Sequence, residues 1–239
     1  MRSHLFQHTE PEGEPGSFQL ANKHMLKVDL TGSGGFFYAK QGSMVAYQGD
    51  VGFDYEGSGS VTKLFKKAFT GEGMSLMKVS GRGDVFLAQD ADEVFVLYLE
   101  NESVTVSGAN ILAFESTLTW DINRVKGAGI ATGGFFNTTL TGTGTAAVTV
   151  VGHAMVLDCS QQPVYVDPQS SVCWSGNLTP SVQNSMNMKS MMRGGSGEAI
   201  QYAFHGPGFV VVQAYEWKPP PANNSGGGGL IKNVTDLIP

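Results

Sequence analysis

Histidine and cysteine are among the side chains of this chain that could bind a metal ion or attack a substrate. The chain has five histidines and two cysteines. No two histidines are spaced as H-x-H or H-E-x-x-H, the cysteines form no C-x-x-C pair, and no G-x-S-x-G nucleophile motif occurs. Cys159 and Cys173 lie in stretches of alternating apolar residues, where a small buried thiol is the expected role. The sequence therefore predicts no metal site, no cofactor and no catalytic residue, and favours a protein that is not an enzyme.

Three other short motifs indicate loops and turns more strongly than chemistry. Residues 57–63 are glycine-rich but lack the Walker pattern, so a flexible joint is expected, with an anion site before a helix as the alternative. Residues 82–84 spell an adhesion tripeptide, but they overlap the G-x-G motif of residues 81–83, which produces such a spelling by chance. The acidic residues at 90–93 lack the spacing of a calcium loop, and we expect a solvated turn between strands.

Basic residues gather in three short segments between longer apolar stretches. Residues 61–69 carry apolar residues at helical spacing opposite lysines, which predicts a short amphipathic helix. Residues 122–127 are a shorter basic segment, and residues 183–193 are rich in methionine. The candidate binding residues are Lys63, Phe65, Lys66, Lys67, Arg124, Lys126, Met186, Met188, Lys189, Met191, Met192 and Arg193. We expect them to form one basic, methionine-rich end that contacts an anionic membrane surface or an acidic protein partner, unless these segments only close the end of the core.

The composition is that of a turn-rich β protein. Hydrophobic residues make up 41% of the 239 residues, charged residues 15%, and 32 residues are glycine. The formal net charge of -6 disfavours binding to nucleic acid, whose phosphates attract Lys and Arg. The N-terminus has neither the apolar core of a signal peptide nor an Arg-rich presequence, so we expect a cytoplasmic, prokaryotic protein, or a mitochondrial one if the source is eukaryotic.

Three segments of 14 residues align without a gap, namely residues 36–49, 103–116 and 163–176. In each, a small residue precedes an aromatic residue at the same position: Tyr47, Phe114 or Trp174. Alternation of apolar and polar residues with a turn in the middle predicts a β-hairpin in every segment.

A G-x-G motif follows each aligned segment, at residues 81–83, 142–144 and 206–208. We interpret each motif as the turn of a second, tight hairpin. The predicted fold is all-β: three similar antiparallel β units packed about a pseudo-threefold axis, sandwich-like or barrel-like, with short helical excursions. The units span about residues 18–91, 92–152 and 153–217 of a single domain. Residues 1–17 form a loose lead-in, and residues 218–239 form a Pro/Gly linker with an apolar tail.

Self-association is expected because antiparallel sheets leave strand edges that need cover. The tail is tethered by a linker long enough to reach a neighbouring molecule. Its candidate self-association residues are Leu230, Ile231, Val234, Leu237 and Ile238. A homo-oligomer is therefore the expected state of the protein.

The run of residues 59–73, followed by residues 79–88, resembles the signature of the altered-inheritance-of-mitochondria 24 family, formerly a domain of unknown function. The resemblance covers about residues 18–217. It implies a β fold like that of the trp RNA-binding attenuation protein, in a mainly bacterial family with mitochondrial members and no established catalytic residues. The methionine-rich third excursion and the Pro/Gly tail depart from the family pattern.

We expect a non-enzymatic scaffold or binding module. Two alternatives remain open at this stage. The first is an RNA-binding β protein by analogy of fold. The second is a metal-dependent enzyme with a cupin-like barrel, which would need clustered metal ligands.

Overall fold

The computed structural model describes residues 17–55, 76–125, 136–184 and 200–215, and all of its regular elements in these ranges are β-strands. The predicted all-β, antiparallel fold is thereby confirmed. The strands are β1 Phe18–Asn22, β2 Met25–Asp29, β3 Phe36–Lys40, β4 Met44–Tyr55, β5 Leu76–Leu87, β6 Glu93–Ser107, β7 Ile111–Glu115, β8 Thr119–Arg124, β9 Phe136–Val150, β10 Ala154–Asp158, β11 Val164–Val166, β12 Ser171–Ser175, β13 Ser181–Asn184, β14 Ile200–Phe204 and β15 Phe209–Gln213.

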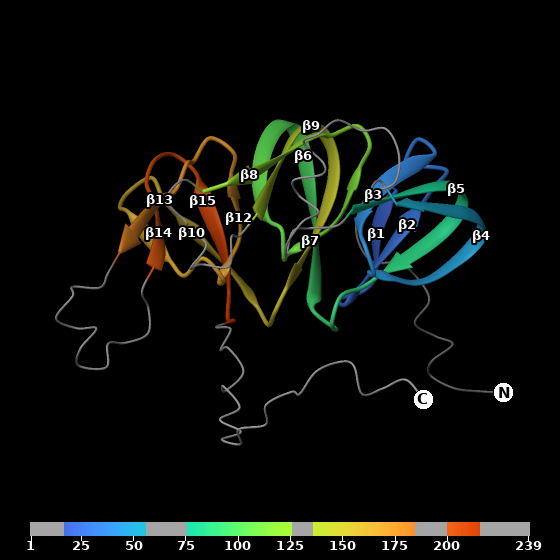
Figure 1. Ribbon diagram of the computed structural model, residues 1–239, viewed down its shortest axis with the longest axis horizontal. Helices are drawn as coiled ribbons and strands as arrows, with labels where there is room; N and C mark the ends of the chain where they lie inside the picture. Colours follow the sequence, from blue (N-terminus) through green and yellow to red (C-terminus); the bar gives the residue numbers. More distant parts are fainter. Residues whose placement is uncertain (1–16, 56–75, 126–135, 185–199, 216–239) are drawn as a thin grey trace, which may run out of the picture.

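The strands form three groups that lie side by side along the long axis of the molecule (Figure 1). β1 to β5 lie at one end, β6 to β9 in the middle, and β10 to β15 make up the third group. A twelve-stranded sheet runs through all three in the order β1-β2-β5-β3-β7-β9-β6-β12-β15-β10, with β4 also paired to β5 and β8 to β9. β11, β14 and β13 form a separate three-stranded sheet.

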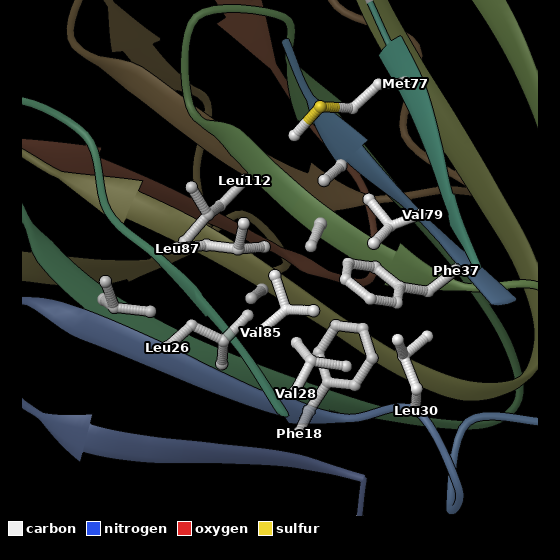
Figure 2. Close-up of a cluster of buried hydrophobic side chains, with 14 residues drawn as sticks. Phe18, Leu26, Val28, Leu30, Phe37, Met77, Val79, Val85, Leu87 and Leu112 are labelled. Atoms are coloured by element: carbon white, nitrogen blue, oxygen red, sulfur yellow. The ribbon is translucent and has the colours of Figure 1, made fainter. Parts of the chain in front are cut away.

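In the first group, β2, β3 and β4 all pair with β5, and β1 pairs with β2. The first half of β5 lies between β3 and the second half of β4, and its second half lies between β2 and the first half of β4. β4 and β5 therefore pass together from one sheet layer into another. Apolar side chains from both layers, among them Leu26, Phe37, Val79 and Val85, pack into one fully buried cluster (Figure 2).

The other two groups pair in the same way around β9 and around β14 with β15. The first half of β9 lies between β6 and β8, and its second half lies between β6 and β7. β14 lies between β11 and β13, and β15 lies between β10 and β12. The paired residues are equivalent when they are counted from the G-x-G glycines. Two residues before the first glycine, the pairs are Phe37 with Val79, Val104 with Leu140 and Val164 with Phe204. Two residues after the second glycine, the pairs are Tyr47 with Val85, Phe114 with Ala146 and Trp174 with Val210.

The prediction that G-x-G forms a hairpin turn is wrong. The glycines lie within β5 and β9 and between the consecutive strands β14 and β15, where the chain bends without reversing. Gly81 has φ +122° and Gly83 has φ +141°. A Cβ on either would overlap a carbonyl oxygen of β4, that of Asp50 or Gln48. Glycine is needed because two paired strands bend together and approach closely at this point.

The hairpins predicted for the three aligned segments are also wrong. β3 and β4 do not pair with each other, and instead both pair with β5 from its two sides. In the same way β6 and β7 share β9, while β11 and β12 pair with β14 and β15. Alternation of apolar residues identifies a strand but does not specify its partner. Consecutive strands here lie on opposite sides of the long central strand.

Two further predictions concern the cysteines and the helical excursions. Cys159 and Cys173 are buried and unbonded, which confirms their placement in the core. The helix predicted for residues 61–69 lies outside the described residues, as do the tail and most of the third excursion, whereas residues 122–124 of the second excursion are the end of β8. The pseudo-threefold axis stays a prediction.

Equivalent glycines of the first two groups provide a matched test of the strand bend. Gly81 and Gly142 have nearly the same φ, +122° and +128°, but a Cβ at Gly142 would meet nothing closer than 3.7 Å. We expect Gly142→Ala to lower the free energy of unfolding by about 1 to 3 kcal/mol, from backbone strain alone. Gly81→Ala should lower the free energy of unfolding by about 1 to 3 kcal/mol more than Gly142→Ala does, because the new methyl group is forced against β4. Urea denaturation measures both, and equal losses would contradict this account of the bend.

Candidate interaction surface

The binding residues predicted from the sequence lie almost entirely outside the described residues. These are Lys63, Phe65, Lys66, Lys67, Lys126, Met186, Met188, Lys189, Met191, Met192 and Arg193. The tail residues Leu230, Ile231, Val234, Leu237 and Ile238 lie outside them as well. Arg124 ends β8, and only its backbone is described. The three excursions connect equivalent antiparallel pairs, β4 to β5, β8 to β9 and β13 to β14. Whether they form one basic end stays a prediction.

The described strands reveal a different candidate surface. Its location follows from the way in which neighbouring groups are joined. β3 of the first group pairs with β7 of the second, and β6 of the second pairs with β12 of the third. Each junction contains three residue pairs. At the centre of one, Tyr38 lies opposite Phe114, and at the centre of the other, Thr105 lies opposite Trp174. Phe114 is aligned with Trp174 in the sequence, and Tyr38 is aligned with Thr105. The two junctions therefore use the same register.

Both junctions bury the strand that carries the aligned aromatic residue. Phe114 is 0% exposed and Trp174 is 2% exposed. The ring of Phe114 lies 5.3 Å from that of Tyr38 across the first junction, while the ring of Trp174 lies 5.4 Å from that of Phe204 within its own group. Burying an aromatic side chain contributes roughly 1.5–3 kcal/mol. Strand pairing and apolar burial therefore hold neighbouring groups together.

The equivalent strand of the first group has no such neighbour among the described strands. We call residues 44–48 the β4 edge. Among the described strands they pair with β5 alone, with a bulge at Val45, and all five residues are exposed. Val45 is 55% exposed and Tyr47 48%, whereas their counterparts Leu112 and Phe114 are fully buried. The β4 edge thus presents to solvent the residue types that the other two groups bury.

The opposite end of the row has the complementary feature. We call Val164–Val166 the β11 edge, because among the described strands β11 pairs only with β14. Tyr165 is 58% exposed, while Thr105, which holds the same position in β6, is 7% exposed. Figure 1 places β13 and β14, the sheet to which β11 belongs, at the end of the row away from β4. One molecule therefore exposes both halves of a junction, at its two ends.

Lys40 is a partly buried titratable group that holds two loops in place. The ammonium of Lys40 donates hydrogen bonds to the side-chain oxygen of Gln89 at 2.6 Å and to the carbonyl oxygen of Ala109 at 2.7 Å. Burial lowers the pKa of Lys40, and burial raises the pKa of Asp92, which is close to Lys40. The bonds of Lys40 fasten the loops after β5 and β6 to the end of β3. This is a structural role.

The described residues offer no metal site and no membrane span. They contain no group of three or more His, Cys, Asp or Glu side chains that could hold a metal ion. No helix in the described ranges has the length and hydropathy of a membrane crossing. Burial raises the pKa of Cys173 to about 12, so this thiol is protonated and shielded from reaction.

Sequence reasoning missed the two open edges, although part of the signal was present. The alignment of Tyr47 with Phe114 and Trp174 shows that the first segment has the apolar character of the other two. It does not show which neighbour covers each segment. That information comes only from the order of strands across the sheet.

The comparisons with known proteins agree on the fold. The family model described as "Mitochondrial biogenesis AIM24" matches residues 18–215. A crystal structure of a Streptococcus pyogenes protein superimposes with a TM-score of 0.65 at 22% sequence identity, over 86% of this chain and 92% of that one. At this identity the likeness concerns the fold alone. No curated protein matches the chain significantly.

Proposed function

The chain belongs to the AIM24 family, and we propose that it acts there as a non-enzymatic, self-associating scaffold or binding module. The observation that carries the proposal is the exposed, apolar β4 edge, whose counterparts in the other two groups are buried by a neighbouring group. Unpaired edges with exposed apolar side chains favour association, because they offer free backbone groups together with apolar surface.

The three groups are proposed to be repeats of one structural unit. Support comes from the shared register around the G-x-G glycines and from the shared register of the two junctions. A closed pseudo-threefold arrangement within one molecule would need a third junction, between the β11 edge and the β4 edge. Among the described strands neither edge has a partner on its outer side, which favours an open row of repeats.

A second part of the proposal is a basic contact surface formed by the excursions. Near an anionic bilayer each Lys or Arg contributes about 1 kcal/mol to binding. We expect the protein to co-sediment with anionic vesicles at low salt, and the combined change Lys63→Glu, Lys66→Glu and Lys67→Glu to remove this binding while the melting temperature stays the same. If the wild-type protein does not bind anionic vesicles, an acidic protein is the remaining partner proposed for this surface.

Light scattering over a range of protein concentrations tests self-association. We expect a mass that rises above the 25.4 kDa of one chain as the concentration increases. A variant that ends at Pro221 serves as the control, because it lacks the apolar tail. If the tail drives association, the variant is monomeric, and if the sheet edges drive it, the variant behaves like the full chain. A monomeric mass for the full chain at every concentration would contradict the proposal.

A further inference from the structure

We propose that copies of this chain associate head to tail, with the β11 edge of one molecule adding as a strand to the β4 edge of the next. The inference rests on the proposed self-association and specifies how it occurs. It would produce between molecules the same junction that already joins the three groups within one molecule.

The two internal junctions supply the template for the register. In both, the residue that aligns with Tyr38 lies opposite the aligned aromatic residue of the partner strand. On the β11 edge the aligned residue is Tyr165, and on the β4 edge it is Tyr47. The predicted pairs between molecules are therefore Val164 with Gln48, Tyr165 with Tyr47 and Val166 with Ala46.

The side chains at the two edges are chemically compatible in this register. Two tyrosines would face each other where the first internal junction pairs Tyr38 with Phe114. The flanking pairs join valine to alanine and to glutamine, so no charged side chain is placed opposite another. Pro163 precedes the β11 edge and has no backbone N–H, which limits pairing at that end. Three pairs remain, the number found in each internal junction.

Burial gives the reason to expect a partner at these edges. Val45 and Tyr47 are about half exposed, although the residues aligned with them are fully or almost fully buried. Likewise, Tyr165 is 58% exposed, whereas the aligned Thr105 is 7% exposed. The two edges lie at opposite ends of the row, so a second copy is the partner that brings them together (Figure 1). Such contacts repeat from copy to copy until a ring closes, or else they form a filament.

Among the further edge strands of the described chain, β10 exposes the large apolar side chains of Met155 and Val156. Its counterpart in the first group, β2, is covered by β1 of the same group. Neither internal junction uses a strand of this type, so the chain offers no template for pairing at β10. The β4 and β11 edges are therefore the pair that the structure matches.

Disulfide trapping between single-cysteine additions tests the register. Tyr47→Cys and Tyr165→Cys alter exposed side chains, and the two native cysteines are buried and should not react in the folded protein. On mild oxidation we expect a mixture of the two variants to give a covalent mixed dimer as the main product. Each variant alone should stay a single chain, and the double variant should give a series of larger covalent products.

Tyr98→Cys is the matched control, because Tyr98 is 49% exposed but lies on β6, which pairs with β9. Mixed with Tyr47→Cys, it should give little cross-linked product. If light scattering shows oligomers but the Tyr47→Cys and Tyr165→Cys mixture does not cross-link, the head-to-tail junction is wrong and self-association still stands. Efficient cross-linking of Tyr47→Cys with itself would also overturn it, in favour of a two-fold contact between β4 edges. A monomeric mass at all concentrations would overturn both proposals.

Discussion

The pairing of strand edges is the interaction on which the rest of this structure depends. An edge strand carries backbone N–H and C=O groups that must be hydrogen-bonded to another strand or to water. Within the chain, β3 pairs with β7 and β6 pairs with β12, so two junctions satisfy four such edges, and the aromatic residues Phe114 and Trp174 are buried there. At the two ends of the row, the β4 edge and the β11 edge have no partner strand on their outer side among the described residues. The proposed function follows from the way in which the backbone groups of those two edges become hydrogen-bonded.

The glycine bend makes these junctions possible. At Gly81 and Gly83 the paired strands β4 and β5 approach so closely that a side chain would overlap the facing backbone. Because the strands bend here, one half of β5 can pair with β3 while the other half pairs with β2. β3 then lies between β5 and β7, where it connects the first group to the second. Local backbone freedom and the assembly of groups are therefore linked.

The sequence predicted the strands, the buried cysteines and the family, because alternation of apolar residues and conspicuous glycines are local features. It did not predict strand partners. Residues 36–49 read equally well as a hairpin or as two strands that flank a third, and only the third strand decides between them. The G-x-G motif is ambiguous for the same reason, since φ above zero suits a turn and also a bend. The exposure of Tyr47 depends on a neighbour, which no local pattern encodes.

Amide hydrogen exchange at two protein concentrations tests the central claim most directly, because it reports on the backbone groups of the edges themselves. The internal junction strands β7 and β12 should be protected at both concentrations. The outward-facing amides of residues 46–48 and 164–166 should exchange slowly in concentrated protein and rapidly after dilution to the monomer. If the amides of these two segments exchange rapidly in the oligomer, the account is contradicted. Protection that appears only at other surfaces would contradict it as well.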